Sequence, residues 1–410
     1  MKELVTARIG NELYAPDIAG RMNAVDRRRF LKGSLAAAVA ASAFEPARAM
    51  EPPVPAGKKL RVGYIGRGSV SHAYLPSLAE AEFIELVSIC DLIESRARDG
   101  AEKHNIPNVF PNIDAMLAGP KFDLLVNTTS MPSHYPVNKK ALQAGCHVWS
   151  EKPMALEVSD ARELLDIAKA KGVQIWAAPT CVVSPQFKFM SEMIQNGKIG
   201  RVTAGHGTYG HGGPTWSAWF YEKGGGSLYD LGVYNVTTLT GLLGPVREVV
   251  GMTSVMNKTR KVDDKGEVAV TADENTMLIM HHGGGVFSHM QTGFVYFEPE
   301  APSRERKVYT IDITGTEGSM HVQGWDWSPA AVDVATQGHN ILTPQCRDKW
   351  PYEWVGGARY VASCLLTGKK SLITAEHGLH VLEVMNACHE SQRTGRRVAV
   401  ESSFPWPIGS

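Results

Sequence analysis

The chain has 410 residues, enough for two domains with substantial cores, and 43% of its residues are hydrophobic. Its 42 basic and 42 acidic residues balance, so the charge gives no indication of a nucleic-acid or acidic-lipid partner. The six cysteines are widely scattered without a Cys-x-x-Cys pair, so neither a zinc site nor a disulfide framework is expected.

Residues 1–49 have the features of a targeting segment. The basic stretch 27–32 precedes an alanine-rich apolar run over 34–44, and Ala47-Arg48-Ala49 offers a small-residue cleavage site. The apolar run is too short to span a bilayer. Twin arginines followed by Phe-Leu-Lys resemble a twin-arginine export signal, which predicts a periplasmic protein. The alternative is an amphipathic N-terminal helix of the fold. Residues 50–59, rich in Pro and Gly, would form a linker.

The first expected strand begins at Leu60 and ends in a glycine-rich turn that opens a helix. In a dinucleotide fold Gly66 would permit the tight turn, Gly68 would let a pyrophosphate approach the backbone, and Ser71 would allow close packing of helix on strand. The helix N-terminus adds free N–H groups for the phosphates. An ordinary glycine turn is the alternative. The residues expected to bind the dinucleotide here are Gly66, Arg67, Gly68, Ser69 and Ser71.

A second strand over Ile84–Cys90 ends in Asp91, at the distance from the turn where a ribose-binding carboxylate belongs. Asp91 would accept hydrogen bonds from the ribose hydroxyls and repel a 2′-phosphate, so NAD is favoured over NADP. Binding of NADP remains an alternative, because Arg67 or Arg96 could reach a 2′-phosphate.

Strand and helix patterns continue to alternate as far as residue 176. Helices are expected at 95–104, 113–118, 136–144 and 159–171, and strands at 109–111, 122–129, 147–150 and 173–176. Continuous apolar strands between helices predict a parallel sheet covered on both faces, a doubly wound Rossmann domain over 60–176.

After Ala177 strand patterns dominate. One helix at 185–196 precedes expected strands at 201–209, 246–256, 275–281, 286–292, 307–315 and 319–322. The pattern predicts an α+β second domain over 177–400 with a mostly antiparallel sheet, late helices at 353–366 and 376–394, and a tail over 401–410. Residues 330–350 show no clear period and are left unassigned.

Polar residues follow two strands of the predicted parallel sheet, where such folds bind ligands. Asn127 and Thr128 close one strand, His134 lies in the following loop, and Glu151-Lys152 follows the next strand. All five are expected near the cofactor. An ordinary solvated Glu–Lys pair is the alternative. In the functional interpretation Lys152 donates a hydrogen bond to a substrate hydroxyl, and partial burial lowers its pKa enough for proton exchange.

A second cluster begins with three glycines, 224–226, and leads into a helix. Asp230 and Tyr234 are four residues apart and share one face of that helix, where they could line a sugar pocket. The alternative is an Asp cap beside a packed Tyr.

Together these motifs resemble the glucose–fructose oxidoreductase / inositol dehydrogenase (Gfo/Idh/MocA) family over roughly residues 58–400. The matching features are Gly66-x-Gly68 with Asp91, Glu151-Lys152-Pro153, Asp230-x-x-x-Tyr234 and Gly315-Thr-Glu-Gly318. The resemblance implies a Rossmann domain followed by an α/β domain whose open sheet often forms a dimer interface, hence a homo-oligomer, dimer or tetramer. It also implies that Lys152 is the catalytic lysine and Asp230 the acidic residue on the substrate side.

Tyr234 departs from the family pattern, because many members carry His there as the acid/base. A tyrosine with its ordinary pKa near 10 is a poor base, but a neighbouring Lys152 ammonium could lower that pKa. Otherwise the base is His206 or His211, each of which could equally be a surface histidine. Aromatic residues nearby could stack on a sugar or pack in the core. The residues expected to contact substrate are His206, His211, Trp216 and Trp219.

The first expected function is NAD(P)-dependent oxidation of a carbohydrate or polyol. An exported enzyme lacks a cytosolic cofactor pool, so it would keep its cofactor tightly bound and regenerate it on a second carbohydrate. The second is a redox-neutral glycoside hydrolase that transiently oxidises a sugar hydroxyl and eliminates the aglycone, as some members of the family do. The third is a non-catalytic sugar- or nucleotide-binding protein, which the intact Lys152 and Asp230 argue against.

Overall fold

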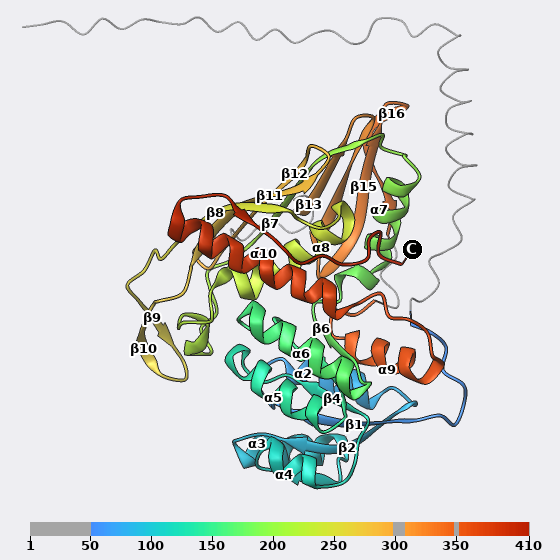
Figure 1. Cartoon of the computed structure of the whole chain (residues 1–410), viewed down its shortest axis with the longest axis vertical. Helices are drawn as coiled ribbons and strands as arrows, with labels where there is room; N and C mark the ends of the chain where they lie inside the picture. Colours follow the sequence, from blue (N-terminus) through green and yellow to red (C-terminus); the bar gives the residue numbers. More distant parts are fainter. Residues whose placement is uncertain (1–50, 298–307, 348–351, 410) are drawn as a thin grey trace, which may run out of the picture. The chain divides into compact units, whose positions relative to one another are not determined.

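The computed structural model describes residues 51–297, 308–347 and 352–409 (Figure 1). The expected targeting segment, 1–49, therefore lies outside the described residues. Residues 51–59 form neither helix nor strand, and β1 begins at Leu60.

A six-stranded parallel sheet forms the first part of the fold, in the order β3-β2-β1-β4-β5-β6. Its strands have apolar side chains buried on both faces, which explains their continuous apolar runs. The chain order reverses between β1 and β4, and ligands of such sheets bind at the carboxyl ends of the strands at this point. The strands are β1 Leu60–Ile65, β2 Ile84–Cys90, β3 Asn108–Phe110, β4 Leu124–Asn127, β5 His147–Ser150 and β6 Ile175–Ala177.

Helices connect these strands. Several end as expected, for example at Gly172, which adopts a left-handed conformation with φ 68°. The helices are α2 Ser71–Ala79, α3 Glu94–His104, α4 Ile113–Ala118, α5 Met131–Gln143 and α6 Val158–Lys171. α2 starts directly after the glycine turn, so its free N–H groups lie at the end of β1.

A nine-stranded sheet follows, in the order β16-β15-β14-β13-β7-β12-β11-β8-β17. All neighbouring strands are antiparallel except β7 and β12. Its strands are β7 Val202–Gly210, β8 Glu248–Ser254, β11 Asn275–Gly283, β12 Val286–Gly293, β13 Tyr309–Gly315, β14 Gly318–Trp325, β15 Ser328–Thr336, β16 His339–Cys346 and β17 Val398–Ala399. A separate hairpin pairs β9 Thr259–Val262 with β10 Gly266–Ala269. The predicted fold class, a Rossmann sheet followed by a mostly antiparallel sheet, is confirmed.

One face of the large sheet packs against helices α8 Val233–Leu243 and α10 Ala375–Thr394 (Figure 1). Gly205 and Gly207 on β7 allow this approach, since a Cβ on Gly205 would lie 2.8 Å from Leu243 and one on Gly207 3.0 Å from Asn235. On the opposite face apolar side chains such as Met252 remain exposed. We call this opposite side the open face.

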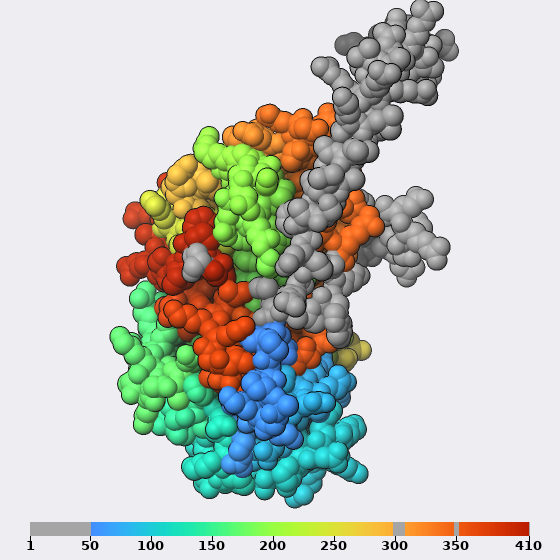
Figure 2. Space-filling model, turned by 90° about the vertical axis from the view of Figure 1, so that its right-hand side faces the viewer, coloured from blue at the N-terminus to red at the C-terminus, as the bar shows by residue number. Residues whose placement is uncertain are grey.

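The chain returns to the Rossmann sheet near its end. Helix α9 Gly357–Thr367 packs against α2 and β5, and α10 contacts α6 and β6. Figure 2 shows the blue start of the described chain beside the orange-red late helices, where Arg359 forms a 2.8 Å ion pair with Glu51. One hydrophobic core runs through both sheets. Among the described residues, none of the helices combines the length and apolar character needed to cross a bilayer.

Candidate active site

The glycine turn after β1 combines one tight contact with one open position. Gly66 has φ +97°, and a Cβ there would lie 2.6 Å from the carbonyl carbon of Thr128. A Cβ on Gly68 would meet nothing within 4 Å. Gly66 is therefore required by the packing of β1 against β4, whereas Gly68 leaves free space beside the start of α2, as a bound pyrophosphate requires.

Asp91 is fixed beside this turn by two backbone donors. Its carboxylate accepts hydrogen bonds from the Arg67 N–H at 2.6 Å and the Ile93 N–H at 2.7 Å. Each carboxylate oxygen has a further lone pair, so Asp91 can still accept from a ribose hydroxyl.

The Arg67 guanidinium is buried inside the domain. It donates to the Ser71 hydroxyl at 2.8 Å and forms a 3.1 Å ion pair with Asp99 on α3. The Ser71 hydroxyl in turn donates to the Gly68 carbonyl at 2.6 Å. The expectation that Arg67 could reach a 2′-phosphate is wrong, because its side chain is already engaged by α2 and α3. Arg96 and Ser69 are exposed.

The polar residues at the end of β4 hold the loops together through their side chains. Asn127 donates to Asn138 at 2.8 Å and accepts from the Thr129 N–H at 3.1 Å. Thr128 donates to the Gly66 carbonyl at 2.7 Å. The His134 ring lies 2.7 Å from the Pro153 carbonyl. These buried side chains thus position the turns after β1, β4 and β5 against one another.

Lys152 and Asp230 meet between the two sheets. The Lys152 ammonium donates to the Asp230 carboxylate at 2.8 Å and to the Asp230 backbone carbonyl at 2.7 Å. Their side chains are only 10% and 16% exposed. The Lys152 ammonium also lies 5.1 Å from the centre of the Tyr234 ring. Glu151 faces the other way and accepts from the Tyr74 hydroxyl of α2 at 2.6 Å.

Asp230 stands on a π-helical turn, Leu228–Gly232, that leads directly into α8. Buried Asp273 holds the start of this turn by accepting from the Leu228 N–H at 3.0 Å and the Ser227 hydroxyl at 2.8 Å. Such turns are rare and frequently occur at functional sites. The sequence analysis missed Asp273, since it lies in a loop more than forty residues from the turn that it holds.

Tyr234 is held as a neutral phenol. Burial raises its pKa well above the ordinary value, and the Glu151 and Asp230 carboxylates raise it further. The expectation that Lys152 lowers this pKa is wrong, because the ammonium is paired with Asp230. Tyr234 can therefore donate a hydrogen bond or a proton, but it is not available as a base near neutral pH.

The two candidate histidines lie on different sides of the large sheet. Gly205 and Gly207 face α8, so His206 between them points to the open face, where the centre of its ring lies 4.2 Å from that of the tilted His289 ring. The expectation of His206 as a base in this site is therefore wrong. His211 follows the end of β7, and its ring lies 6.1 Å from Tyr209, which lies 6.1 Å from Tyr234.

Trp216 and Trp219 reach the Lys152 site only through other rings. Trp219 stacks on Phe220 at 3.7 Å, and Trp216 packs edge-on against the same ring at 5.3 Å. A chain of contacts then runs from Phe220 through Phe294, His211 and Tyr209 to Tyr234. A second aromatic group reaches Tyr234 directly. Trp327 lies 6.3 Å from Tyr234 and 6.0 Å from Trp354, measured between ring centres. Neither of these two tryptophans carried a sequence signal.

Comparison with known families matches both parts of the chain. Residues 60–178 match the oxidoreductase family with an NAD-binding Rossmann fold, and residues 187–321 match the GFO/IDH/MocA C-terminal domain. The chain belongs to the Gfo/Idh/MocA family of oxidoreductases.

Characterised relatives of this Gfo/Idh/MocA oxidoreductase align over most of their length. The chain is 27% identical to D-glucoside 3-dehydrogenase of Escherichia coli, over 83% of this chain and 97% of the relative. It is 25% identical to trans-1,2-dihydrobenzene-1,2-diol dehydrogenase of Mus musculus, over 76% of this chain and 90% of the relative. The solved apo levoglucosan dehydrogenase superimposes with a TM-score of 0.73 at 19% identity, over 85% of this chain and all of that one. This last likeness shows the fold alone.

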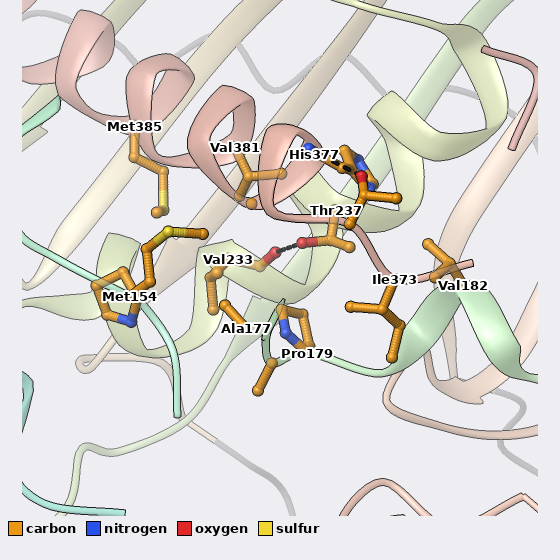
Figure 3. A pocket seen from close by; sticks show the side chains of 14 residues that line it. Met154, Ala177, Pro179, Val182, Val233, Thr237, Ile373, His377, Val381 and Met385 are labelled. Atoms are coloured by element: carbon orange, nitrogen blue, oxygen red, sulfur yellow. Dashed lines mark hydrogen bonds between the residues drawn. The ribbon is translucent and has the colours of Figure 1, made fainter. Parts of the chain in front are cut away.

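A small cavity lies behind the site of this Gfo/Idh/MocA oxidoreductase (Figure 3). Its volume is about 20 Å³, and its lining is mainly apolar, including Met154, Val233, Val381 and Met385. That volume is about the size of one water molecule. The cavity is therefore a packing void between the two sheets and is too small for a substrate.

Proposed function

We propose that this oxidoreductase oxidises a ring hydroxyl of a neutral sugar, cyclic polyol or glycoside, with NAD as its cofactor. The observation that carries the proposal is the buried Lys152–Asp230 pair, in which a lysine after β5 of a dinucleotide fold meets an acid of the second domain. The named substrates of relatives, such as a D-glucoside and scyllo-inositol, support the substrate class.

The residues around the glycine turn fit NAD. The open space at Gly68 accommodates a pyrophosphate, and Asp91 presents a carboxylate to the ribose. A 2′-phosphate would face that carboxylate, while the Arg67 guanidinium is engaged with Asp99. These contacts favour NAD over NADP. When bound, the nicotinamide supplies the acceptor for a hydride from the substrate carbon.

Lys152 and Asp230 have complementary roles in this proposal. An ammonium has three N–H donors, and Asp230 engages two of them, so the third can bind the substrate hydroxyl and stabilise negative charge on its oxygen. Within the described residues no side chain donates to Asp230 Oδ2, which leaves that oxygen to accept the hydroxyl proton. Tyr234 adds a second hydrogen-bond donor.

A substitution at Lys152 tests the function. The purified protein is denatured to release and identify bound nicotinamide cofactor, and D-glucose, methyl glucosides, levoglucosan and scyllo-inositol are then screened with and without added NAD. We expect Lys152→Ala to retain cofactor and to lose turnover by at least about 100-fold, because one preorganised donor typically contributes that much. Lys140→Ala is the matched control, since Lys140 is 45% exposed and pairs with Asp114 on the surface. Turnover of Lys152→Ala at the wild-type rate would refute the proposal.

Redox-neutral cleavage of glycosides is a second candidate, favoured by the protonated state of Tyr234. After oxidation of a ring hydroxyl, loss of the adjacent C–H proton would expel the aglycone, whose oxygen needs a proton that a neutral phenol can supply. Water would then add, and the hydride would return to the sugar. Adding an aryl glucoside to the screen distinguishes the two candidates, because this reaction releases its aglycone without net change in nicotinamide absorbance. Family membership and the intact Lys152–Asp230 pair argue against the non-catalytic alternative.

We further infer export to the periplasm from the arginine pair within 27–32. An exported enzyme would keep its cofactor bound and reoxidise it by reducing the carbonyl group of a second carbohydrate. Replacing both consecutive arginines at 27 and 28 by lysine should leave the protein in the cytoplasmic fraction. Unchanged fractionation would argue against this route.

We also infer a homo-oligomer assembled through the open face. Met252, Met277 and Ile279 are 72%, 51% and 52% exposed there. β8 and β11 place Met252 directly opposite Met277, so the apolar side chains form one patch. Light scattering of wild type and Met277→Glu tests this inference, because a charge in a buried apolar contact should dissociate the assembly. A monomeric wild type would contradict it.

A further inference from the structure

A cleft of about 420 Å³ opens beside the candidate active site, between α2 and the turn from β14 to β15. One wall is the face of α2 that carries Ala73, Pro76, Ser77 and Glu80. The opposite wall comes from residues 327–328 and 352–355, which include two tryptophans and a tyrosine. The volume lies in the range of small-molecule sites.

The aromatic wall of the cleft continues into the site itself. Trp327 lines the cleft, and its ring packs 6.3 Å from that of Tyr234. Trp354 packs 6.0 Å from Trp327 and 6.2 Å from Tyr74, whose hydroxyl holds Glu151. The cleft is therefore connected to the Lys152 site through the rings of Trp327 and Tyr234.

The composition of the cleft matches a sugar ring. Indole and phenol rings offer faces for the C–H groups of a pyranose, and the Glu80 carboxylate offers acceptors for its hydroxyls. Glu353 Oε2 already accepts from the Ser77 hydroxyl across the cleft at 3.2 Å, which leaves Oε1 as its acceptor. The Trp327 indole N–H is shielded from solvent and has no hydrogen-bond partner within the described residues.

We propose that this cleft is a subsite for the second sugar unit of a neutral disaccharide or longer glycoside, whose first ring is oxidised at Lys152. The inference rests on the proposed function and narrows its substrate class. A free monosaccharide would leave the cleft filled with water, whereas a glycoside would bury its second ring against Trp327 and Trp354.

Glucose and its disaccharides provide the test. We expect cellobiose or maltose to show a kcat/KM at least 10-fold above that of D-glucose with the cofactor-loaded enzyme. Ser328→Trp, which fills the cleft from its exposed rim, should reduce that advantage to within about 3-fold. Ser403→Trp, at an exposed serine of the C-terminal tail, is the control and should behave as wild type.

Calorimetric titration of the same disaccharides separates failure of the subsite from failure of the proposed function. Disaccharide binding that Ser328→Trp abolishes and Ser403→Trp preserves supports the subsite even if no sugar is oxidised. Equal turnover of glucose and both disaccharides would overturn the subsite while sustaining the oxidoreductase. Disaccharide binding that survives Ser328→Trp would overturn it as well.

Discussion

At the scale of single residues, the charge around Tyr234 decides what the site can do. A lone lysine beside a phenol would stabilise phenolate, but the Lys152 ammonium donates to two oxygens of Asp230. The charges that act on Tyr234 are then those of Glu151 and Asp230, and together with burial they raise its pKa. In the proposed site Tyr234 therefore acts as a hydrogen-bond donor and not as a base.

Tyr234→Phe tests this role. We expect kcat/KM to fall by about 10-fold, since one hydrogen bond contributes about 1–1.5 kcal/mol. The pH profile between 5 and 8 should keep its shape, because a phenol with a raised pKa does not titrate there. Tyr135→Phe, on the exterior of α5, serves as the control. Loss of an inflection near neutral pH in Tyr234→Phe would instead identify Tyr234 as the base.

Sequence patterns located the residues that stand at the ends of regular elements. Lys152 follows a buried parallel strand and Asp230 follows a run of glycines, so their approximate places could be predicted. His206 was misplaced because one residue of strand register separates the helix-covered face from the open face. Trp327 and Asp273 were missed because they contact residues far away in the sequence. The spacing of apolar residues within one segment does not indicate such contacts.

At the scale of elements, the turn between β1 and α2 contains two glycines with different surroundings, Gly66 and Gly68. Gly66 lies against the backbone of the turn after β4, with a positive φ that other residues rarely adopt. Gly68 has no such constraint and faces free space. The first glycine is therefore required by the fold, and the second is proposed to leave room for the ligand.

The variants Gly66→Ala and Gly68→Ala should separate these roles. We expect Gly66→Ala to lower the free energy of unfolding by about 2 kcal/mol or more, from strain and from the clash with Thr128. Gly68→Ala should melt within about 2 °C of wild type after cofactor removal, but bind NAD at least about 10-fold more weakly, because its methyl group occupies the phosphate space. Thermal unfolding and NAD titration measure both effects. Wild-type affinity in Gly68→Ala would mean that the turn does not hold the pyrophosphate.

Helices and strands were predicted correctly where buried residues recur at a regular spacing, and the prediction failed at a sheet edge. The strands of the parallel sheet were recognised from their apolar runs, and α6 from its apolar face. β16 went unassigned because it is an edge strand whose residues are mostly exposed, so it shows no alternation of buried and exposed residues. β15 shows none either, because residues 331–334 are all buried. The π-helical turn that contains Asp230 also has no sequence pattern that distinguishes it from an ordinary helix.

At the scale of the whole molecule, buried histidines in the second domain make stability depend on pH. His282 donates from Nδ1 to the Gly244 carbonyl at 2.7 Å, and His380 Nε2 accepts from the Val246 N–H at 2.9 Å. His377 lies 2.8 Å from the Thr240 hydroxyl. Burial lowers the pKa of His282 and His380 to about 4 and that of His377 to about 3. Each ring is thus held neutral in one tautomer.

These lowered histidine pKa values make the folded state less stable at acidic pH. In the unfolded chain the histidines bind protons near pH 6.5, whereas the folded chain binds them only near pH 3–4, so stability falls as pH drops from about 6.5 towards 4. Buried Asp326 acts in the opposite direction, because burial raises its pKa to about 6 and the folded state takes up its proton first. One carboxyl cannot offset three histidines, so the net effect between pH 7 and 5 should be a loss of several kcal/mol.

Chemical unfolding at pH 7, 6 and 5 measures this slope, and His380→Gln should flatten it. Glutamine does not titrate, so the variant should lose stability at pH 7 through its weaker contacts with Val246 and Ser402, yet lose less than wild type on acidification. His339→Gln, at an exposed position of β16, should leave the slope unchanged. Equal slopes for His380→Gln and wild type would mean that His380 binds its proton with the same pKa in the folded and unfolded chain, which its burial and the Val246 N–H donated to its Nε2 oppose.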